Sequence, residues 1–203
     1  MINIGILAST KATDMQAIID AIEAKKLNAR ISVLISNKED SYALVRAKNH
    51  NIDAVFIDSK NKEREEFDKE INSVLKKNNV DLIILIGYMR WLSEWFVKEW
   101  KNKIINIHPS LLPNFAGGMD KDVHEEVLNS NVKKTGCTLH FVDESKDNGP
   151  IILQKEVNID DNETIETLKE KVQKAEQEII LRGIKLFDEG KIKVDGGKVR
   201  ILE

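Results

Sequence analysis

The sequence predicts a doubly wound α/β protein with a mostly parallel sheet, antiparallel C-terminal strands and a long C-terminal helix. Short apolar runs alternate with segments of helical period through the first half of the chain, as in parallel strands joined by helices. The run Asp81–Ile86 is apolar on both faces, which is typical of a central parallel strand. After Pro113 the strands become longer and a long amphipathic segment follows. The expected architecture is therefore Rossmann-like.

The elements before Pro113 follow from the spacing of apolar residues. Helical spacing of three or four is marked by Met15, Ile18, Ile19, Ile22, Phe67, Ile71 and Leu75. The expected strands are Ile2–Ala8, Arg30–Ser36, Ala54–Ile57, Asp81–Ile86 and Ile104–Ile107. The expected helices between them are Asp14–Lys26, Tyr42–Asn49, Lys62–Asn78 and Leu92–Trp100. Helices of this length between strands imply right-handed crossovers.

The pattern after Pro113 predicts a different arrangement. A helix is expected at Lys121–Asn129, followed by longer, partly antiparallel strands at Gly136–Val142 and Ile151–Ile159. Glu163–Phe187 has apolar residues near a 3.6-residue period and predicts a long charged helix. In the tail, Gly196-Gly197 lies between two short alternating runs, which indicates a hairpin.

Length and composition indicate one globular domain, residues 1–203. Within it we distinguish an α/β half, 1–113, on the nucleotide or phosphate side and a C-terminal half, 114–203. The chain is 41% hydrophobic and 32% charged, close to average usage. A net charge of −3 leaves no basic surface for nucleic acid.

Cysteine usage and hydropathy predict a cytoplasmic protein. Cys137 is the single cysteine, which excludes an intrachain disulfide, and its place in an expected strand favours a buried, inert thiol. The N-terminal segment is too short and uncharged for a signal peptide, and no apolar stretch is long enough to span a membrane.

The end of the expected strand Ile104–Ile107 carries the most informative side chains. Residues i and i+2 of a strand point the same way, so Asn106 and His108 emerge together just before Pro109. An amide donor beside an imidazole suits a carbonyl oxygen that becomes negative. A capping Asn and a structural His are the alternative reading. Ligands collect at the carboxyl ends of parallel strands, which adds Ala8–Asp14 and Gly87–Leu92 to the same rim.

A carboxylate follows the strand that ends near Val142. Asp147 precedes Asn-Gly-Pro, whose backbone preferences form a tight turn. A carboxylate held there could pair with an imidazole and favour its protonated form. The alternative is a solvated turn aspartate.

These segments together resemble the folate-dependent formyltransferases. Asn106–Pro113 reads Asn-Ile-His-Pro-Ser-Leu-Leu-Pro, Gly87–Arg90 reads Gly-Tyr-Met-Arg, and Asp147–Ile152 reads Asp-Asn-Gly-Pro-Ile-Ile, all in the family's order. The resemblance runs from Ile2 to about Ile184. Because of its length, without an added domain, the chain most resembles the branch of the family that formylates glycinamide ribonucleotide (GAR) in purine biosynthesis.

The resemblance implies a direct formyl transfer. The GAR amine would attack the formyl carbon of 10-formyltetrahydrofolate, a co-substrate, with no metal. Asn106 and His108 would stabilise the tetrahedral oxyanion. Asp147 would keep His108 protonated and help a proton pass from the amine to the leaving nitrogen. Small molecules are the only partners implied, and the chain is expected to be a monomer or homodimer.

The resemblance also assigns binding residues. The folate residues implied are Arg64, Met89, Arg90, Trp91, Leu92, Asn106 and Val142. The GAR residues implied are Lys11, Ala12, Thr13, Asp14 and Glu176. Without the resemblance, Arg64 and Glu176 read as solvated helix charges, and Trp91 and Leu92 as helix-start core residues. His140 matches a further family histidine near the active site, or is a packed strand residue, while His50 and His124 read as surface or structural.

Two segments depart from the family pattern. Ser9–Asp14 replaces a Gly-rich phosphate loop and has no glycine. Thr13 or Asp14 can cap the following helix, whereas Ala12 stands where glycine's positive φ would normally be used. Lys11 would offset the nearby Asp14 charge, a hypothesis that fails if Lys11→Ala leaves the KM for GAR unchanged.

The second departure, Phe115–Asp120, is a loop about three residues longer than usual that borders the acceptor site.

The same sequence features are compatible with other functions. An amino-sugar nucleotide formyltransferase would share Asn106, His108 and Asp147, and a formyltetrahydrofolate hydrolase would need water as acceptor, but both usually carry an extra domain. A non-catalytic folate- or nucleotide-binding module is the alternative from another class. A dinucleotide-binding module is disfavoured because Ser9–Asp14 lacks Gly-x-Gly-x-x-Gly.

Overall fold

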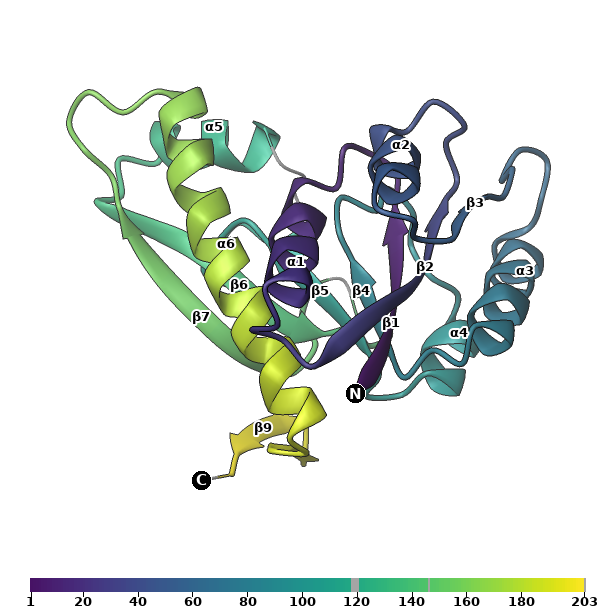
Figure 1. Cartoon of the computed structure of the whole chain (residues 1–203). Helices are drawn as coiled ribbons and strands as arrows, with labels where there is room; N and C mark the ends of the chain where they lie inside the picture. Colours follow the sequence, from purple (N-terminus) through teal and green to yellow (C-terminus); the bar gives the residue numbers. More distant parts are fainter. Residues whose placement is uncertain (118–120, 146, 203) are drawn as a thin grey trace. The chain divides into compact units, whose positions relative to one another are not determined.

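The computed structural model of the protein describes residues 1–117, 121–145 and 147–202. The chain divides into two compact units, Met1–Ile105 and Asn106–Glu203. In strand order the larger sheet is β3-β2-β1-β4-β5-β6-β7, and a second sheet pairs β8 with β9 (Figure 1). This mixed α/β arrangement confirms the predicted fold class. The single-domain organisation stays a prediction.

The first unit is built on four parallel strands. Their bounds are β1 Ile2–Ala8, β2 Ala29–Ser36, β3 Ala54–Phe56 and β4 Leu82–Leu85. β1 lies between β2 and β4 and pairs with both in parallel. All four residues of β4 are buried, as the apolar run predicted for a central strand. Parallel pairing places the carboxyl ends of these strands at one edge, where their loops can meet.

The helices of the first unit lie between successive strands. Their bounds are α1 Thr13–Glu23, α2 Tyr42–Asn49, α3 Arg64–Lys77 and α4 Glu94–Glu99. α2 agrees with its predicted bounds, whereas α4 starts later than the expected Leu92. Ser93 is the N-cap of α4, and its hydroxyl accepts a hydrogen bond from Phe96 N. Because an N-cap residue has non-helical backbone angles, it ends the helix at that point.

The second unit pairs an antiparallel hairpin with a long helix. After β5 (Ile104–His108), the elements are α5 Lys121–Asn129, β6 Lys134–Phe141, β7 Ile151–Asn158 and α6 Ile165–Asp188. β6 and β7 are antiparallel, as predicted, and α6 packs against both. A Cβ at Gly183 of α6 would lie 2.2 Å from Leu139 Cδ2, so glycine allows this helix to approach β6 closely.

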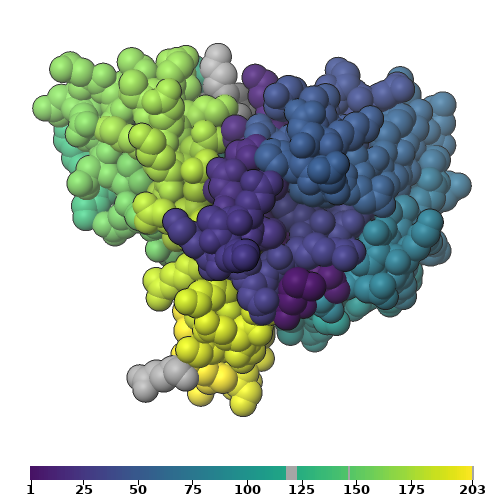
Figure 2. Space-filling view, viewed as in Figure 1, coloured from purple at the N-terminus to yellow at the C-terminus, as the bar shows by residue number. Residues whose placement is uncertain are grey.

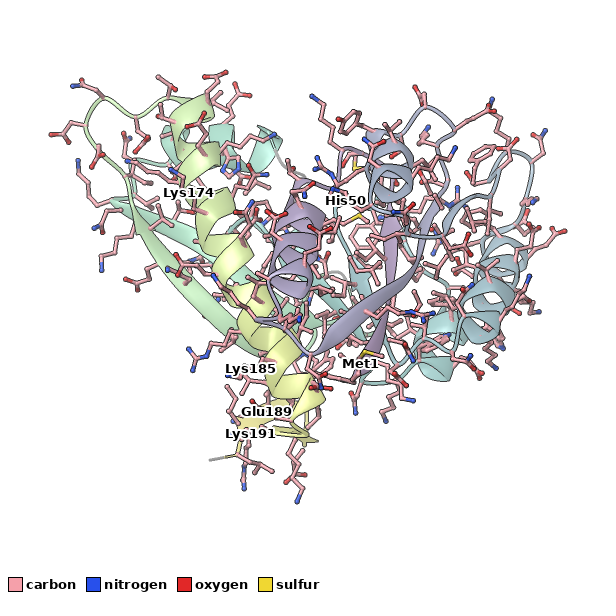
Figure 3. All side chains as sticks on the ribbon, viewed as in Figure 1. Met1, His50, Lys174, Lys185, Glu189 and Lys191 are labelled. Atoms are coloured by element: carbon pink, nitrogen blue, oxygen red, sulfur yellow. The ribbon has the colours of Figure 1, made fainter. Side chains whose placement is uncertain are left out.

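A two-stranded hairpin follows α6. β8 (Ile192–Asp195) and β9 (Lys198–Ile201) are antiparallel around Gly196-Gly197, which confirms the hairpin predicted from these glycines. In Figure 2 this C-terminal segment protrudes beyond the end of the long helix. Figure 3 shows Lys185, Glu189 and Lys191 together at that end, where Lys191 Nζ lies 3.3 Å from Glu189 Oε2.

The structure also tests the expectations for the single cysteine and for membrane spans. Cys137 is fully buried on β6, as expected for an inert thiol. In residues 1–117, 121–145 and 147–202, no helix has the length and apolar character of a membrane span.

Candidate active site

The strand β5 presents Asn106 and His108 from alternate positions. Asn106 is partly exposed, whereas His108 is only 3% exposed. The imidazole Nε2 of His108 lies 3.0 Å from the carbonyl oxygen of Phe115. A carbonyl can only accept, so this nitrogen carries the hydrogen and donates. The other ring nitrogen, Nδ1, is then the one that faces the carboxylate described next.

Asp147 is a half-buried turn residue next to both histidines of the site. Its side chain is 11% exposed, so the solvated-aspartate reading is wrong. One carboxylate oxygen, Oδ2, accepts a hydrogen bond from Gly117 N at 3.0 Å and lies 3.7 Å from His108 Nδ1. The other, Oδ1, lies 3.8 Å from His140 Nε2. These last two distances are within ion-pair range but exceed hydrogen-bond length.

The turn that holds Asp147 depends on local backbone geometry. Asp147 has φ 48°, in the left-handed region that Asp tolerates better than most residues. Two residues on, a Cβ at Gly149 would lie 1.9 Å from the carbonyl oxygen of Phe141. Only glycine fits this close approach, and Phe141 N bonds to Pro150 O at 2.9 Å. The end of β6 and the turn at Asp147 are therefore held together by backbone contacts.

His140 completes the cluster from the end of β6. Its Nδ1 lies 2.9 Å from Phe141 O, and its Nε2 lies 3.1 Å from Asn106 Nδ2. The ring is 2% exposed, and burial lowers its pKa. Sequence reasoning left this residue between a packed strand histidine and a site residue. The one feature of the sequence that indicates a site role for His140 is its position near the carboxyl end of the strand. Local periodicity does not reveal its partner Asn106, which lies on β5.

The first unit brings two predicted rim segments together. Ser9 Oγ donates to Asn37 Oδ1 at 2.6 Å and accepts from Met89 N at 2.8 Å. Ser9 N also donates to Gly87 O at 3.0 Å. The segments Ala8–Asp14 and Gly87–Leu92 therefore meet at the carboxyl edge of the parallel strands, as the topology predicted.

The glycine-free loop keeps the backbone of a glycine position. Ala12 has φ 45° and ψ 57° and is the N-cap of α1. Thr13 is the first helical residue and Asp14 the second. The prediction that Thr13 or Asp14 is the cap residue is wrong, because the N-cap is Ala12, which makes no side-chain cap hydrogen bond. Lys11 is exposed, whereas Asp14 is 6% exposed in the first turn.

The residues assigned to folate by resemblance differ in exposure. Met89 is 47% exposed and Trp91 38%, so Trp91 is not a core residue. Leu92 and Val142 are partly exposed, and Arg64 is exposed at the start of α3. These side chains leave apolar surface available to a ligand.

Arg90 lies over the ring of Phe67, and its charge acts on the buried Asp68 near the start of α4. Its guanidinium stacks on the Phe67 ring at 4.7 Å. Asp68 is 1% exposed and accepts from Ser93 N at 2.6 Å. Burial raises the pKa of Asp68, an effect that the Ser93 hydrogen bonds and the Arg90 charge oppose. Burial likewise raises the pKa of the neighbouring Tyr88 hydroxyl. This packing orients the segment that carries Met89 to Leu92.

The remaining predicted residues divide between described and undescribed segments. Glu176 on α6 is 9% exposed, so its reading as a solvated helix charge is wrong. His124 is buried, with 2% of its surface exposed, and His50 bonds to Glu23, which agrees with structural roles.

In the longer loop, residues 118–120 lie outside the described residues. Among the residues described, no three His, Cys, Asp or Glu side chains gather as metal ligands would, and the expected absence of a metal stays a prediction.

Comparison with known proteins gives consistent relatives. The formyl transferase family profile matches residues 2–184. The chain is 38% identical to phosphoribosylglycinamide formyltransferase of Haemophilus influenzae over 96% of this chain and 91% of that protein. It is 39% identical to the human trifunctional purine biosynthetic protein adenosine-3 over 97% of this chain, which spans only 19% of that protein.

Solved structures extend the similarity to the fold. Glycinamide ribonucleotide transformylase 1 from Symbiobacterium toebii superposes with a TM-score of 0.95 at 39% identity, covering 100% of this chain and 95% of that one. A formyltetrahydrofolate deformylase from Pseudomonas syringae is 24% identical with a TM-score of 0.91, covering 100% of this chain and 66% of that chain, and shows the fold alone. The profile match over most of the chain establishes that this protein belongs to the formyl transferase family.

Proposed function

We propose that the protein transfers the formyl group of 10-formyltetrahydrofolate to the primary amine of GAR. The observation that carries this proposal is the convergence of Asn106, His108 and Asp147 in the second unit. His108 Nδ1 lies 3.7 Å from Asp147 Oδ2, and two residues before it Asn106 presents an amide. The names of the Haemophilus influenzae and Symbiobacterium toebii relatives support GAR as acceptor.

The proposed reaction needs no covalent enzyme intermediate. The amine nitrogen forms a bond to the formyl carbon, whose oxygen becomes an oxyanion. Asn106 and the Nδ1–H of protonated His108 donate hydrogen bonds to that oxygen, and such donors are worth about 3–4 kcal/mol each in the transition state. The carbon then separates from N10 of the folate. The amine loses one proton and N10 gains one, and Asp147 assists that transfer while it holds His108 charged.

Binding roles are proposed residue by residue. We propose that Lys11, Ala12, Thr13 and Asp14 bind the GAR phosphate and that Glu176 accepts hydrogen bonds from its ribose hydroxyls. For the folate, the proposed residues are Arg64, Met89, Arg90, Trp91, Leu92, Asn106 and Val142. The exposed apolar surface of Met89 and Trp91 supports a planar ligand there. Cytoplasmic location and a monomeric or dimeric state remain part of the proposal.

A turnover assay with three acceptors tests the proposal. The protein is supplied with 10-formyltetrahydrofolate and GAR, an amino-sugar nucleotide or water, and tetrahydrofolate release is measured. We expect release that depends on GAR. Release with the amino-sugar nucleotide alone would assign a different formyltransferase, and release without any amine would assign a hydrolase. A protein that binds folate and releases no product with any acceptor would be a binding module.

Two variants test the roles of the site. His108→Ala and Asp147→Asn should each lower kcat by about 10²-fold or more while the Kd for folate changes by less than about threefold. His50→Ala serves as the control, because the His50 ring bonds to Glu23 within the first unit. Losses confined to folate affinity would instead mean that His108 and Asp147 are structural.

A further inference from the structure

Both ring nitrogens of His140 have partners that define its protonation. Nδ1 lies 2.9 Å from Phe141 O, an atom that can only accept. Nδ1 therefore carries a hydrogen. The ring is 2% exposed, and burial disfavours a second proton. The neutral ring with hydrogen on Nδ1 leaves Nε2 as an acceptor.

This tautomer determines which end of the Asn106 carboxamide faces the ring. His140 Nε2 lies 3.1 Å from Asn106 Nδ2. A lone pair on Nε2 is compatible with an amide N–H and not with an amide oxygen. One hydrogen of the NH₂ group is thus used by His140. The second hydrogen of the NH₂ group and the oxygen Oδ1 remain available to a ligand. The Asn106 carboxamide is thereby held in one of its two possible orientations.

Charged neighbours act on this ring in opposite directions. Asp147 Oδ1, 3.8 Å from Nε2, and the more distant Asp143 favour a protonated ring. Burial and the His108 charge oppose protonation. A second proton on the ring would place an N–H against the amide N–H of Asn106 and remove its acceptor. The neutral ring is the state that fits the observed contact.

We propose that His140 is a positioning residue: its Nε2 accepts from the Asn106 carboxamide and holds the second amide N–H ready for the oxyanion. This inference rests on the proposed function, in which Asn106 donates to that oxygen. His140 itself touches neither substrate in the reaction. A carboxamide free to rotate would present its oxygen Oδ1 to the substrate about half of the time. The negative oxygen of the tetrahedral intermediate would repel Oδ1, so Asn106 stabilises that oxygen only in the orientation that presents its N–H.

Two substitutions separate the two ring nitrogens. His140→Asn keeps a donor near Nδ1 and has no atom at the Nε2 position, whereas His140→Gln places a carboxamide near Nε2. We expect His140→Asn to lower kcat by about 10- to 100-fold with KM for both substrates changed less than about threefold. His140→Gln should recover at least part of this loss. The control His50→Asn should leave kcat unchanged.

A double-mutant cycle tests whether His140 acts through Asn106. In the Asn106→Ala background, His140→Asn should lower kcat by less than about twofold, because the amide it orients is gone. Equal losses in both backgrounds would overturn the proposal and make His140 a structural residue. An Asn106→Ala variant with full activity would instead contradict the proposed role of Asn106.

A measurement on the unmodified protein covers the case in which the variants fold poorly, which thermal melts would reveal. The ¹⁵N chemical shifts of the His140 ring distinguish its two neutral tautomers. At pH 7.5 we expect a protonated Nδ1 and an unprotonated Nε2. A ring protonated at Nε2 would overturn the proposal, because Nε2 could then accept nothing from Asn106.

Discussion

Tertiary surroundings decide the backbone conformation of one residue in this protein and the protonation of another. Ala12 lies at φ 45°, where a side chain costs about 1–2 kcal/mol relative to the right-handed region. His140 is held neutral by burial although Asp147 lies nearby. Ala12 lies in the loop that we propose binds the GAR phosphate, and His140 lies beside Asn106. Such local strain is expected where surrounding structure holds a site in shape.

The strain at Ala12 can be measured directly. Ala12→Gly should raise the free energy of unfolding by up to about 1 kcal/mol, since the relief of strain exceeds glycine's added unfolded-state entropy. Urea denaturation measures the change. Ala17→Gly, inside α1, is the matched control and should lower stability by about 1 kcal/mol. Equal losses in the two variants would mean that Ala12 is not strained.

The protonation of His140 predicts a pH dependence of stability. Its folded pKa lies below the unfolded value, so below about pH 6.5 the unfolded chain binds more protons. The stabilisation is therefore complete above that pH and decreases as the pH falls towards the folded pKa. Relative to His140→Gln, the wild type should lose stability as the pH falls from about 6.5 to 5.5, by no more than about 1.4 kcal/mol per pH unit.

Urea titrations of both proteins at several pH values give this difference, because the other histidines cancel. A difference that stays constant across the range would show that His140 titrates alike in the folded and unfolded chains.

Element ends carry much of the site in both units. Asn106 and His108 lie at the end of β5, and His140 lies near the end of β6. Helix starts are defined by local hydrogen bonds: Ser93 begins α4, and Thr164 begins α6 with a reciprocal bond to Thr167. The long α6 carries Glu176 and packs on β6, so its start affects the whole second unit.

The cap of α6 has a predictable energetic effect. Thr164 Oγ1 accepts from Thr167 N at 3.2 Å, and Thr167 Oγ1 accepts from Thr164 N at 3.0 Å. Thr164→Ala should lower the free energy of unfolding by about 1 kcal/mol, whereas Thr164→Ser, which keeps the hydroxyl, should change it much less. Chemical denaturation compares the two. Equal losses would show that the methyl group, not the cap, matters.

At the scale of the whole molecule, a C-terminal hairpin follows the part that the family profile matches. The family profile ends at residue 184, and the β8–β9 hairpin follows. Neither strand has a buried residue, and Figure 2 shows this segment protruding beyond α6. Because no residue of either strand is buried, the hairpin contributes little apolar burial to the rest of the second unit.

Removal of the hairpin is therefore expected to be tolerated. A chain ending at Gly190 should keep kcat within about twofold and lose no more than about 1–2 kcal/mol of stability, because few apolar side chains become exposed. Turnover and urea denaturation of the shortened and full chains give both values. Loss of cooperative unfolding in the shortened chain would show that the hairpin supports α6.

Sequence reasoning predicted element types well because they depend on local patterns. The run Tyr42–Asn49 and the Gly196-Gly197 hairpin agree with the structure, since periodicity and turn chemistry act within a few residues. Helix ends were less accurate: α3 begins at Arg64 instead of Lys62. Ends depend on which side chain caps the helix, and several residues in sequence can do so.

By itself the sequence determined the α/β order of elements, the shared direction of Asn106 and His108, and the family resemblance. These follow from alternation along a strand and from ordered motifs. Tertiary structure alone decided that Asp147 is half-buried beside His108, that His140 Nε2 lies 3.1 Å from Asn106 Nδ2, and that Glu176 is buried. Hydrogen bonds and burial join residues distant in the chain, and no local pattern records which partners the fold brings within reach.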